Sequence, residues 1–176
     1  MANAGKLILK YALLLAVFCG MAGLLLPLVH DLTAPRIAAY QQKLEDDSLH
    51  LVFPEGKEII PKDNYYEAFD ENGRLIGYVL KIRSQGYSSE IEMLVGLKKA
   101  RDLQITGVKV LSQMETPGLG SKVENSTFLS NLTGRTRRTL RLRKDGGDID
   151  AITGATITSR AVVDGLRRNI ETFVAI

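Results

Sequence analysis

One uncharged apolar stretch near the N-terminus constrains this chain most. Residues 11–29 contain no Asp, Glu, Lys or Arg. A helix of this length rises about 1.5 Å per residue and spans roughly the hydrocarbon core of a bilayer, so we predict a single transmembrane helix over 11–29. Lys6 and Lys10 precede the stretch closely, whereas the first arginine after it is Arg36. Because positively charged flanks stay in the cytoplasm, residues 1–10 are expected to be cytoplasmic and the remainder extracytoplasmic.

A cleaved export signal is the alternative, because such signals also begin with a short basic segment followed by an apolar run. The run is long, and Leu26-Pro27-Leu28-Val29 lacks the small-x-small pattern of a cleavage site, so we favour a retained helix. The only cysteine, Cys19, lies within the stretch. The chain therefore cannot form an internal disulfide or a cysteine-ligated zinc or iron–sulfur site, and we expect no metal site.

The residues after the span predict an α+β fold, in which an antiparallel sheet is packed against helices. Thr33 can cap a juxtamembrane helix over 30–52, with Pro35 in its first turn. Phe53-Pro54-Glu55-Gly56 should end that helix, because the residue before proline is pushed out of helical conformation. The remaining residues, 53–176, are predicted to form one domain.

Two β-hairpins are predicted within this domain, because apolar runs alternate with short polar turns. Asn72-Gly73 is a strong signal for the first turn. Gly77 and Gly107 interrupt the second strand of each hairpin, so we expect a bulge or a close backbone approach at both. The paired segments are 65–69 with 75–82, and 91–97 with 103–111.

A third strand-like stretch over 139–143 belongs to a basic run over 135–144. Basic runs raise the question of nucleic-acid binding. The net charge of only +3, the absence of aromatic residues from the run and the expected extracytoplasmic location argue against a nucleic-acid partner. A solvated strand face is the simplest interpretation, and an acidic partner or anionic lipid surface is the alternative.

The last predicted element is a helix from about Ser159, as its N-cap, to Phe173. A small, hydroxyl-rich loop over 148–158 leads into it. Free N–H groups and the helix dipole at a helix N-terminus favour a phosphate. Such a loop can equally be a simple helix cap, and the residues alone leave both interpretations open.

The same loop resembles a known modification signature. Asp150-Ala-Ile-Thr153-Gly154-Ala155-Thr156 is similar to the Asp-x-x-Ser/Thr-Gly-Ala-Thr/Ser flavinylation signature of FMN-binding domains. In that family a flavin transferase moves FMN from FAD onto the last hydroxyl residue. The resemblance implies FMN bound covalently to Thr156 through a phosphoester. It also implies that Gly154 and Ala155 leave room for the enzyme and the phosphate, and that Asp150 helps the transferase recognise the acceptor.

A second stretch extends the resemblance over nearly the whole chain. Glu115-Thr116-Pro117-Gly118-Leu119-Gly120, with Gly86-Tyr87 and Leu94-Val95-Gly96 upstream, resembles the G subunit of Rnf complexes and the C subunit of sodium-pumping NADH:quinone oxidoreductases. The short length and single span favour the Rnf protein. The resemblance implies that residues 115–120 border the flavin, where the residues alone indicate a Pro-Gly turn. Ser88-Ser89 departs from the family pattern, which has a glycine nearby.

The implied function is electron transfer through FMN, as a redox subunit of an ion-translocating ferredoxin:NAD oxidoreductase complex with no catalytic site of its own. The implied location is a bacterial inner membrane, with the main domain in the periplasm. Implied partners are the other subunits, the membrane and, during maturation, the flavin transferase. Two alternatives remain: an FMN-domain protein of another respiratory or regulatory system, and a cofactor-free, membrane-tethered structural subunit.

Overall fold

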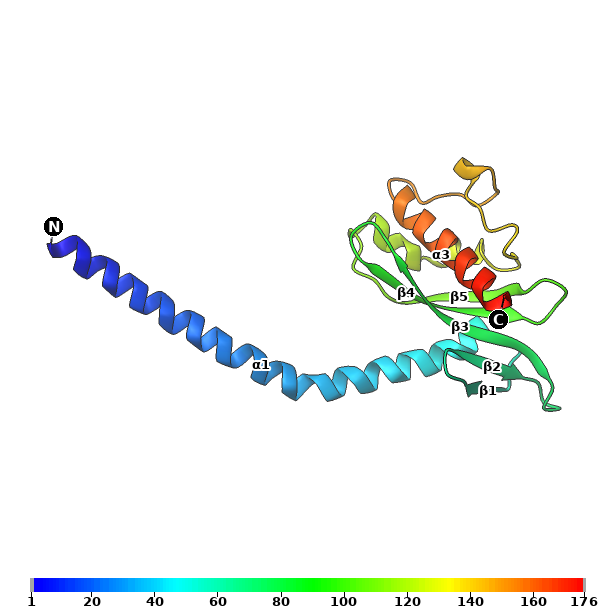
Figure 1. Cartoon of the computed structure of the whole chain (residues 1–176), viewed down its shortest axis with the longest axis horizontal. Coiled ribbons are helices and arrows are strands. Elements are labelled where there is room, and N and C mark those ends of the chain that lie inside the picture. The colour runs from blue at the N-terminus through cyan, green and yellow to red at the C-terminus, as the bar shows by residue number, and fades with distance from the viewer. Residues whose placement is uncertain (1, 176) are drawn as a thin grey trace. The chain divides into compact units, whose positions relative to one another are not determined.

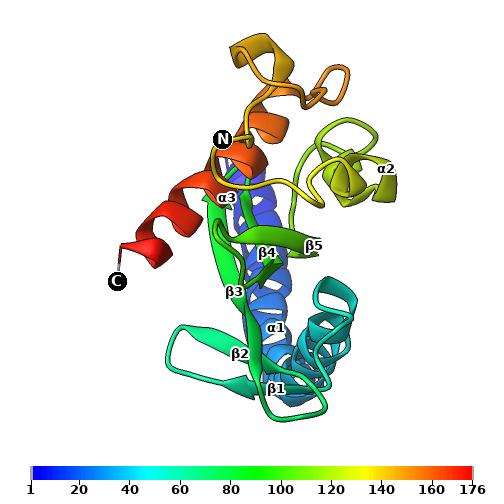
Figure 2. The ribbon, with the colours of Figure 1, turned by 90° about the vertical axis from the view of Figure 1, so that its right-hand side faces the viewer.

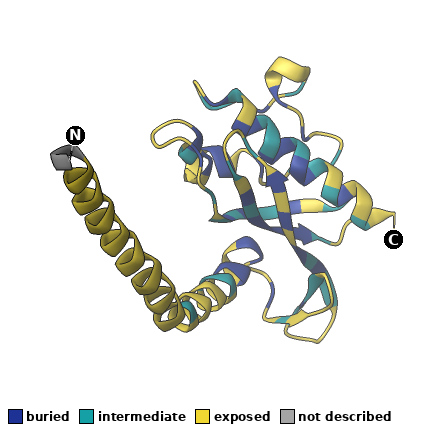
Figure 3. Cartoon of the chain, turned by 60° about the vertical axis from the view of Figure 1, so that its left-hand side comes forward, coloured by how far each residue is buried: buried dark blue, intermediate teal, exposed yellow. Residues whose placement is uncertain are grey.

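A computed structural model describes residues 2–175 and divides into two compact units, one ending at Lys43 and the other beginning at Leu44. The first unit is helical and consists of most of helix α1 (Ala2–Val52) (Figure 1). Its side chains are exposed from Gly5 to Thr33 (Figure 3). Within the described residues, α1 is the one helix long and apolar enough to cross a membrane.

The structure corrects the prediction of a separate helix capped by Thr33. Helix α1 continues through this region, so Thr33 lies in its interior and donates a hydrogen bond from Oγ1 to the carbonyl oxygen of Val29, at 2.9 Å. A threonine inside a helix often bonds back to the preceding turn in this way. Pro35 also lies within the helix rather than at its start. The predicted end was right, because α1 ends at Val52.

The second unit is built on one five-stranded antiparallel sheet whose strands are neighbours in chain order. Both predicted hairpins are confirmed, with boundaries within a few residues of those expected. The first strand was not predicted, because it is short and mostly exposed and so lacks a clear apolar alternation. The strands are β1 (Glu58–Pro61), β2 (Tyr65–Phe69), β3 (Leu75–Gln85), β4 (Glu90–Lys98) and β5 (Gln104–Ser112).

Glycines in three neighbouring strands let the end of α1 lie directly on the sheet. A Cβ added at Gly77 would overlap the Phe53 ring, and one at Gly96 would overlap the carbonyl oxygen of Val52. The pairing register also slips beside Gly77 and beside Gly107. A Cβ at Gly107 would lie 3.0 Å from Cα of Val52. The bulge and the close backbone approach predicted at Gly77 and Gly107 are therefore both confirmed.

The two faces of the sheet carry separate apolar cores. Leu49 and Val52 from the end of α1 and Phe53, the residue after it, fill one core together with side chains of β2, β3 and β4. The other core contains Val162 and Leu166 of helix α3 (Thr156–Val174). Figure 1 shows α3 crossing the sheet, and Figure 2 shows the segment between β5 and α3 at one end of the sheet and β1 and β2 at the other.

Two predictions for the segment before α3 were wrong. Residues 139–143 form no strand: Leu142 makes a single bridge to Ile149, and the chain then enters the 3-10 helix η2 (Arg143–Asp145). The alternation that suggested a strand is real, since Leu140 and Leu142 are buried in the core, but these residues have no strand beside them.

The last helix begins at Thr156 rather than near Ser159. Ser159 lies inside its first turn, where its hydroxyl donates to the carbonyl oxygen of Ala155 at 2.9 Å. The hydroxyl also accepts a hydrogen bond from the backbone N–H of Ile152, at 2.9 Å. Ser159 therefore fastens the preceding loop to the helix instead of capping it, and the shift places Thr156 at the first position of α3.

Candidate functional site

Thr156 occupies an uncapped helix N-terminus. The preceding residue, Ala155, has no side chain that can cap the helix. The first backbone hydrogen bond of α3 is donated by the N–H of Ser159 to the carbonyl oxygen of Ala155. Among the described residues, the N–H groups of Thr156, Ile157 and Thr158 have no acceptor. Free N–H groups at a helix N-terminus attract anions, phosphate in particular.

Gly154 shapes the turn that presents Thr156. Its φ of +79° lies in the left-handed region, which side chains make costly. A Cβ at this position would also lie 3.0 Å from Cδ2 of Leu119. The glycine thus allows the loop to turn sharply and to pass close to the segment that begins at Glu115.

Two hollows meet at Thr156. The first, of about 450 Å³, is named here the Tyr87 hollow. It is lined by Tyr87, Thr116, Leu119, Gly120, Ile157 and Thr158, together with Gly154, Ala155 and Thr156. The second, of about 360 Å³, is the Lys144 hollow, lined by Arg143, Lys144, Asp150 and Thr153 and again by Gly154 and Thr156. Thr156 itself is half-buried, so its hydroxyl can be reached from the surface.

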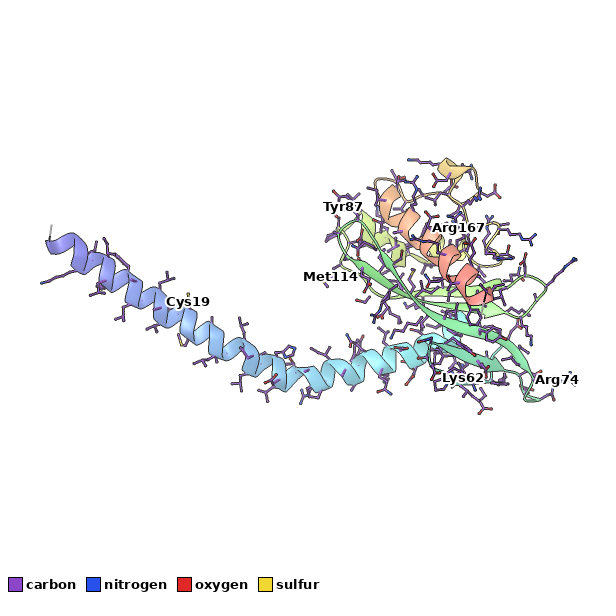
Figure 4. The ribbon with its side chains drawn as sticks, in the orientation of Figure 1. Cys19, Lys62, Arg74, Tyr87, Met114 and Arg167 are labelled. Atoms are coloured by element: carbon purple, nitrogen blue, oxygen red, sulfur yellow. The ribbon has the colours of Figure 1, made fainter. Side chains whose placement is uncertain are left out.

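The rim of the Tyr87 hollow is apolar and exposed. Tyr87 is 66% exposed, and Ile157 is 55% exposed. Met114 lies at the same end of the domain as Tyr87 (Figure 4) and is 82% exposed. Exposed apolar side chains gathered at one hollow are typical of a surface that binds a ligand or a partner.

The Lys144 hollow is ringed by charged groups. Nζ of Lys144 donates to Oγ1 of Thr156 at 3.3 Å. Among the described residues no hydrogen bond joins Asp150 to Thr156, and the Asp150 carboxylate pairs instead with the guanidinium of Arg143 at 2.9 Å. Asp145 is paired with Arg160 at 2.8 Å, and this hydrogen-bonded ion pair lowers the pKa of Asp145. A single cation is thus directed at the hydroxyl.

Glu115 lies beneath the Tyr87 hollow and joins three segments. Its carboxylate accepts hydrogen bonds from the backbone N–H groups of Tyr87, Ser88 and Ser89, at 3.1, 3.0 and 2.9 Å. It also accepts one from the hydroxyl of Thr158 on α3, at 2.6 Å. The side chain is only 5% exposed. The carboxylate therefore holds the turn between β3 and β4 against the start of α3.

The ionised form of Glu115 is stabilised by these donors. Burial raises the pKa of the carboxyl, but the hydrogen bonds from Thr158 and from the backbone of Ser88, Ser89 and Tyr87 outweigh it. The net effect lowers the pKa from 4.5 to about 2. Gly86 and Gly120 complete the cradle, because a Cβ at either would lie within 2.7 Å of the Glu115 side chain.

The structure brings together most of the residues that the sequence singled out. Thr153, Gly154, Ala155 and Thr156 line the two hollows, as do Thr116, Leu119 and Gly120. Pro117 and Gly118 line neither hollow. They form a turn closed by the N–H of Leu119 on the carbonyl oxygen of Thr116, at 3.1 Å, with Gly118 at a φ of +75°.

Sequence reasoning did not identify Lys144, Thr158 or the Ser88-Ser89 turn as parts of this site. Lys144 was visible only as one member of a basic run, and Thr158 as one of several hydroxyl residues in the loop. Ser88 and Ser89 stood out as a departure from the family pattern, and the structure gives that departure a role. Both backbone N–H groups and the Ser89 hydroxyl donate to the Glu115 carboxylate. The Ser88 hydroxyl lies 3.2 Å from the carbonyl oxygen of Met114 and 3.4 Å from the carboxylate, and it can donate to either.

Two family descriptions match the chain: "FMN-binding domain" over residues 86–171 and "RnfG N-terminal region" over residues 1–52. Among solved structures, the C subunit of the Na⁺-translocating NADH-quinone reductase from Parabacteroides distasonis has a similar fold. Its TM-score is 0.52 at 22% identity, and the likeness covers 62% of this chain and 60% of that one.

Curated relatives match over almost the full length. The G subunit of the ion-translocating oxidoreductase complex of Methanosarcina acetivorans is 30% identical, with 94% of each chain covered. The protein of the same name from Aliivibrio fischeri is 33% identical, covering 92% of this chain and 88% of the relative. The G subunit of the proton-translocating ferredoxin:NAD⁺ oxidoreductase complex of Clostridium ljungdahlii is 29% identical, covering 89% and 86%. Residues 86–171 therefore form an FMN-binding domain, and this chain belongs to the family of G subunits of ion-translocating oxidoreductase complexes.

Proposed function

We propose that this protein relays electrons within an ion-translocating oxidoreductase complex through an FMN esterified to Thr156. The observation that carries the proposal is the setting of that hydroxyl. It stands at an uncapped helix N-terminus, 3.3 Å from a lysine ammonium, where two hollows meet. The family description of residues 86–171 and the names of the curated relatives support the choice of FMN and of electron transfer.

The residues present fit FMN in both of its parts. A phosphate on Thr156 would face the free N–H groups of the first turn of α3 and the ammonium of Lys144. The apolar rim of Tyr87, Leu119 and Ile157 would face the flat ring system. At about 450 Å³, the Tyr87 hollow falls within the usual size range of small-molecule sites. When bound, the flavin supplies the redox chemistry, and the protein sets its position and surroundings.

The attachment reaction is a phosphoryl-group transfer in which nothing is oxidised or reduced. Oγ1 of Thr156 forms a bond to the FMN phosphorus of FAD, and the bond from that phosphorus to the bridging oxygen breaks. AMP leaves with the bridging oxygen, and the hydroxyl proton passes to a base of the flavin transferase. The half-buried Thr156 hydroxyl is reachable by such an enzyme. Asp150, held by Arg143 on the exposed side of the loop, is placed where the transferase could contact it.

The membrane arrangement follows from the charges beside the span. We propose that residues 11–29 cross the membrane, that Lys6 and Lys10 remain in the cytoplasm and that the FMN-binding domain from residue 53 lies outside, in the periplasm of a bacterial cell. A covalent bond would then keep the cofactor on the protein in a compartment from which a free flavin could diffuse away. The other subunits of the complex are its proposed electron donors and acceptors.

In-gel flavin fluorescence tests the proposal. The full-length protein, Thr156→Ala and Thr172→Ala are each produced in membranes with an active flavin transferase and then denatured, which removes any flavin that is not covalently bound. Thr172→Ala is the matched control, because it removes an exposed threonine hydroxyl near the other end of α3, outside both hollows. We expect fluorescent bands for the native protein and for Thr172→Ala, and a dark band for Thr156→Ala. A dark native band beside a fluorescent control substrate would refute covalent attachment and favour the alternative of a cofactor-free structural protein.

A further inference from the structure

We propose that Lys144 is a positioning residue for flavin attachment, whose ammonium group holds the negative charge of the phosphate that becomes bonded to Thr156. This inference rests on the proposed function. It begins from one contact: Nζ of Lys144 lies 3.3 Å from Oγ1 of Thr156, the oxygen that would form the phosphoester bond. A phosphate oxygen on that hydroxyl would be within reach of the same ammonium.

Lys144 is free to take this role because the neighbouring cations are already paired. Arg143 is held by Asp150 at 2.9 Å, and Arg160 is held by Asp145 at 2.8 Å. Among the described residues, no carboxylate forms an ion pair with Lys144. It is therefore the cation beside Thr156 whose charge is not neutralised by a direct partner within the protein.

The two ion pairs also fix the turn that carries Lys144. Residues 143–145 form the 3-10 helix η2, which closes at Gly146 with a φ of +83°. The residue before Lys144 is tied to Asp150 in the loop that leads to Thr156, and the residue after it is tied to Arg160 on α3. Both anchors lie on the elements that flank the acceptor hydroxyl. The backbone of Lys144 is thereby held next to Thr156, and only its side chain has to remain ordered.

The ammonium would act at two stages of the reaction. While the bond to the bridging oxygen of FAD breaks, Lys144 would lie beside the phosphate on Thr156, and a positioned cation stabilises negative charge that develops there. Afterwards, the phosphodiester keeps one negative charge, and the ammonium can donate a charge-assisted hydrogen bond to it. The side chain is exposed, so water weakens the effect. We expect removal of the charge to slow attachment by about three- to tenfold rather than to abolish it.

The test compares full-length Lys144→Ala and Lys144→Arg with Lys99→Ala, which removes one exposed lysine from the β4–β5 turn and so changes the net charge equally. The first readout is the initial rate of flavin incorporation with FAD and the transferase. The second readout is the difference in Tm between each protein with FMN attached and the same protein without FMN. We expect Lys144→Ala alone to be slow and to gain less Tm on loading, with Lys144→Arg close to the native protein.

Two results would overturn the inference. One is a rate for Lys144→Ala equal to that of Lys99→Ala. The other is a slow rate combined with an undiminished Tm gain, which would mean that the lysine contacts the transferase and not the phosphate. Failure of the proposed function would look different, because the native protein itself would then incorporate no flavin.

Discussion

Replacing Glu115 by glutamine should loosen the cradle beneath the Tyr87 hollow. Glutamine keeps the size of the side chain but replaces one carboxylate oxygen with an amide group that can only donate. In the native protein both carboxylate oxygens accept hydrogen bonds. Oε1 accepts from the backbone N–H groups of Ser88 and Ser89. Oε2 accepts from the backbone N–H of Tyr87 and from the hydroxyl of Thr158. Whichever way the amide turns, it places a donor against other donors.

The magnitude follows from the pKa of the carboxyl. A shift from 4.5 to about 2 corresponds to about 3 kcal/mol in favour of the folded state when the group is ionised, at about 1.4 kcal/mol per pH unit. Because the folded pKa of Glu115 is the lower one, this stability is complete above pH 4.5 and is lost as the pH falls toward 2. About 2 kcal/mol of it should already be gone at pH 3. For a domain of this size, about 3 kcal/mol is worth about 10 °C in Tm.

Thermal unfolding of full-length Glu115→Gln and native protein, followed by near-ultraviolet circular dichroism at pH 7 and pH 3, measures this effect. We expect the variant to melt about 10 °C lower at pH 7 and the two melting points to approach each other at pH 3. Asp70→Asn is the matched control, because Asp70 also accepts backbone N–H groups but lies on an exposed turn far from the hollow. A Tm difference for Glu115→Gln that is the same at both pH values would show that the carboxylate charge is not what holds the cradle.

Three further predictions concern the fold, the loop and the membrane topology. Gly96→Ala should destabilise the domain by about 3 kcal/mol, because its methyl group would overlap the backbone of Val52; thermal unfolding measures this, and an unchanged Tm would contradict it. Gly154→Ala should lower the free energy of unfolding by about 1 kcal/mol, because a side chain disfavours the positive φ at this position. It should also slow flavin incorporation, and an unchanged incorporation rate would show that the turn at Gly154 is not needed to present Thr156. In a variant lacking Cys19, a membrane-impermeant thiol reagent should label Asn72→Cys but not Ala4→Cys in intact cells, and Ala4→Cys leaves Lys6 and Lys10 in place. The reverse labelling pattern would contradict the proposed topology.

The elements predicted well are those whose signals are local. Asn72-Gly73 and the alternating strands around it give the first hairpin, and Phe53-Pro54 gives the end of α1. The glycines in β3 and β5 also predicted close backbone approach, because a glycine inside a strand has little other use. The partner in that approach, the end of α1, could not be read from the strands themselves.

The elements predicted wrongly are those whose residues are compatible with two different local structures. A threonine followed by proline can start a helix, yet the continuous apolar helix carries Thr33 and Pro35 in its interior. Serine at 159 is a good N-cap residue, but its hydroxyl bonds back to Ala155 and accepts the N–H of Ile152. In each case neighbouring structure, and not local preference, decides which hydrogen bond forms.

The site itself depends on contacts between residues that are distant in the sequence. Glu115 meets the turn at Ser88 and the start of α3 at Thr158, and no local pattern indicates either contact. The proposed acceptor, Thr156, could be singled out from the sequence because the signature that ends at it is contiguous. The Glu115 cradle could not be predicted from the sequence, because it forms only when three separate segments of the chain fold together.

The shape of the site gives a physical reason for the proposed covalent bond between Thr156 and FMN. Small-molecule sites that retain a ligand by contacts alone usually bury about 70–90% or more of its surface. Here the Tyr87 hollow has an exposed rim, in which Tyr87 and Ile157 remain more than half accessible. Such a rim leaves a flat ring system open to a redox partner, but it provides too little burial to hold that ring system tightly. A bond at Thr156 removes the conflict, because tethering raises the local concentration of the cofactor without deepening the hollow. With the proposed phosphoester retaining the cofactor, the Glu115 cradle would need only to fix the walls of the hollow.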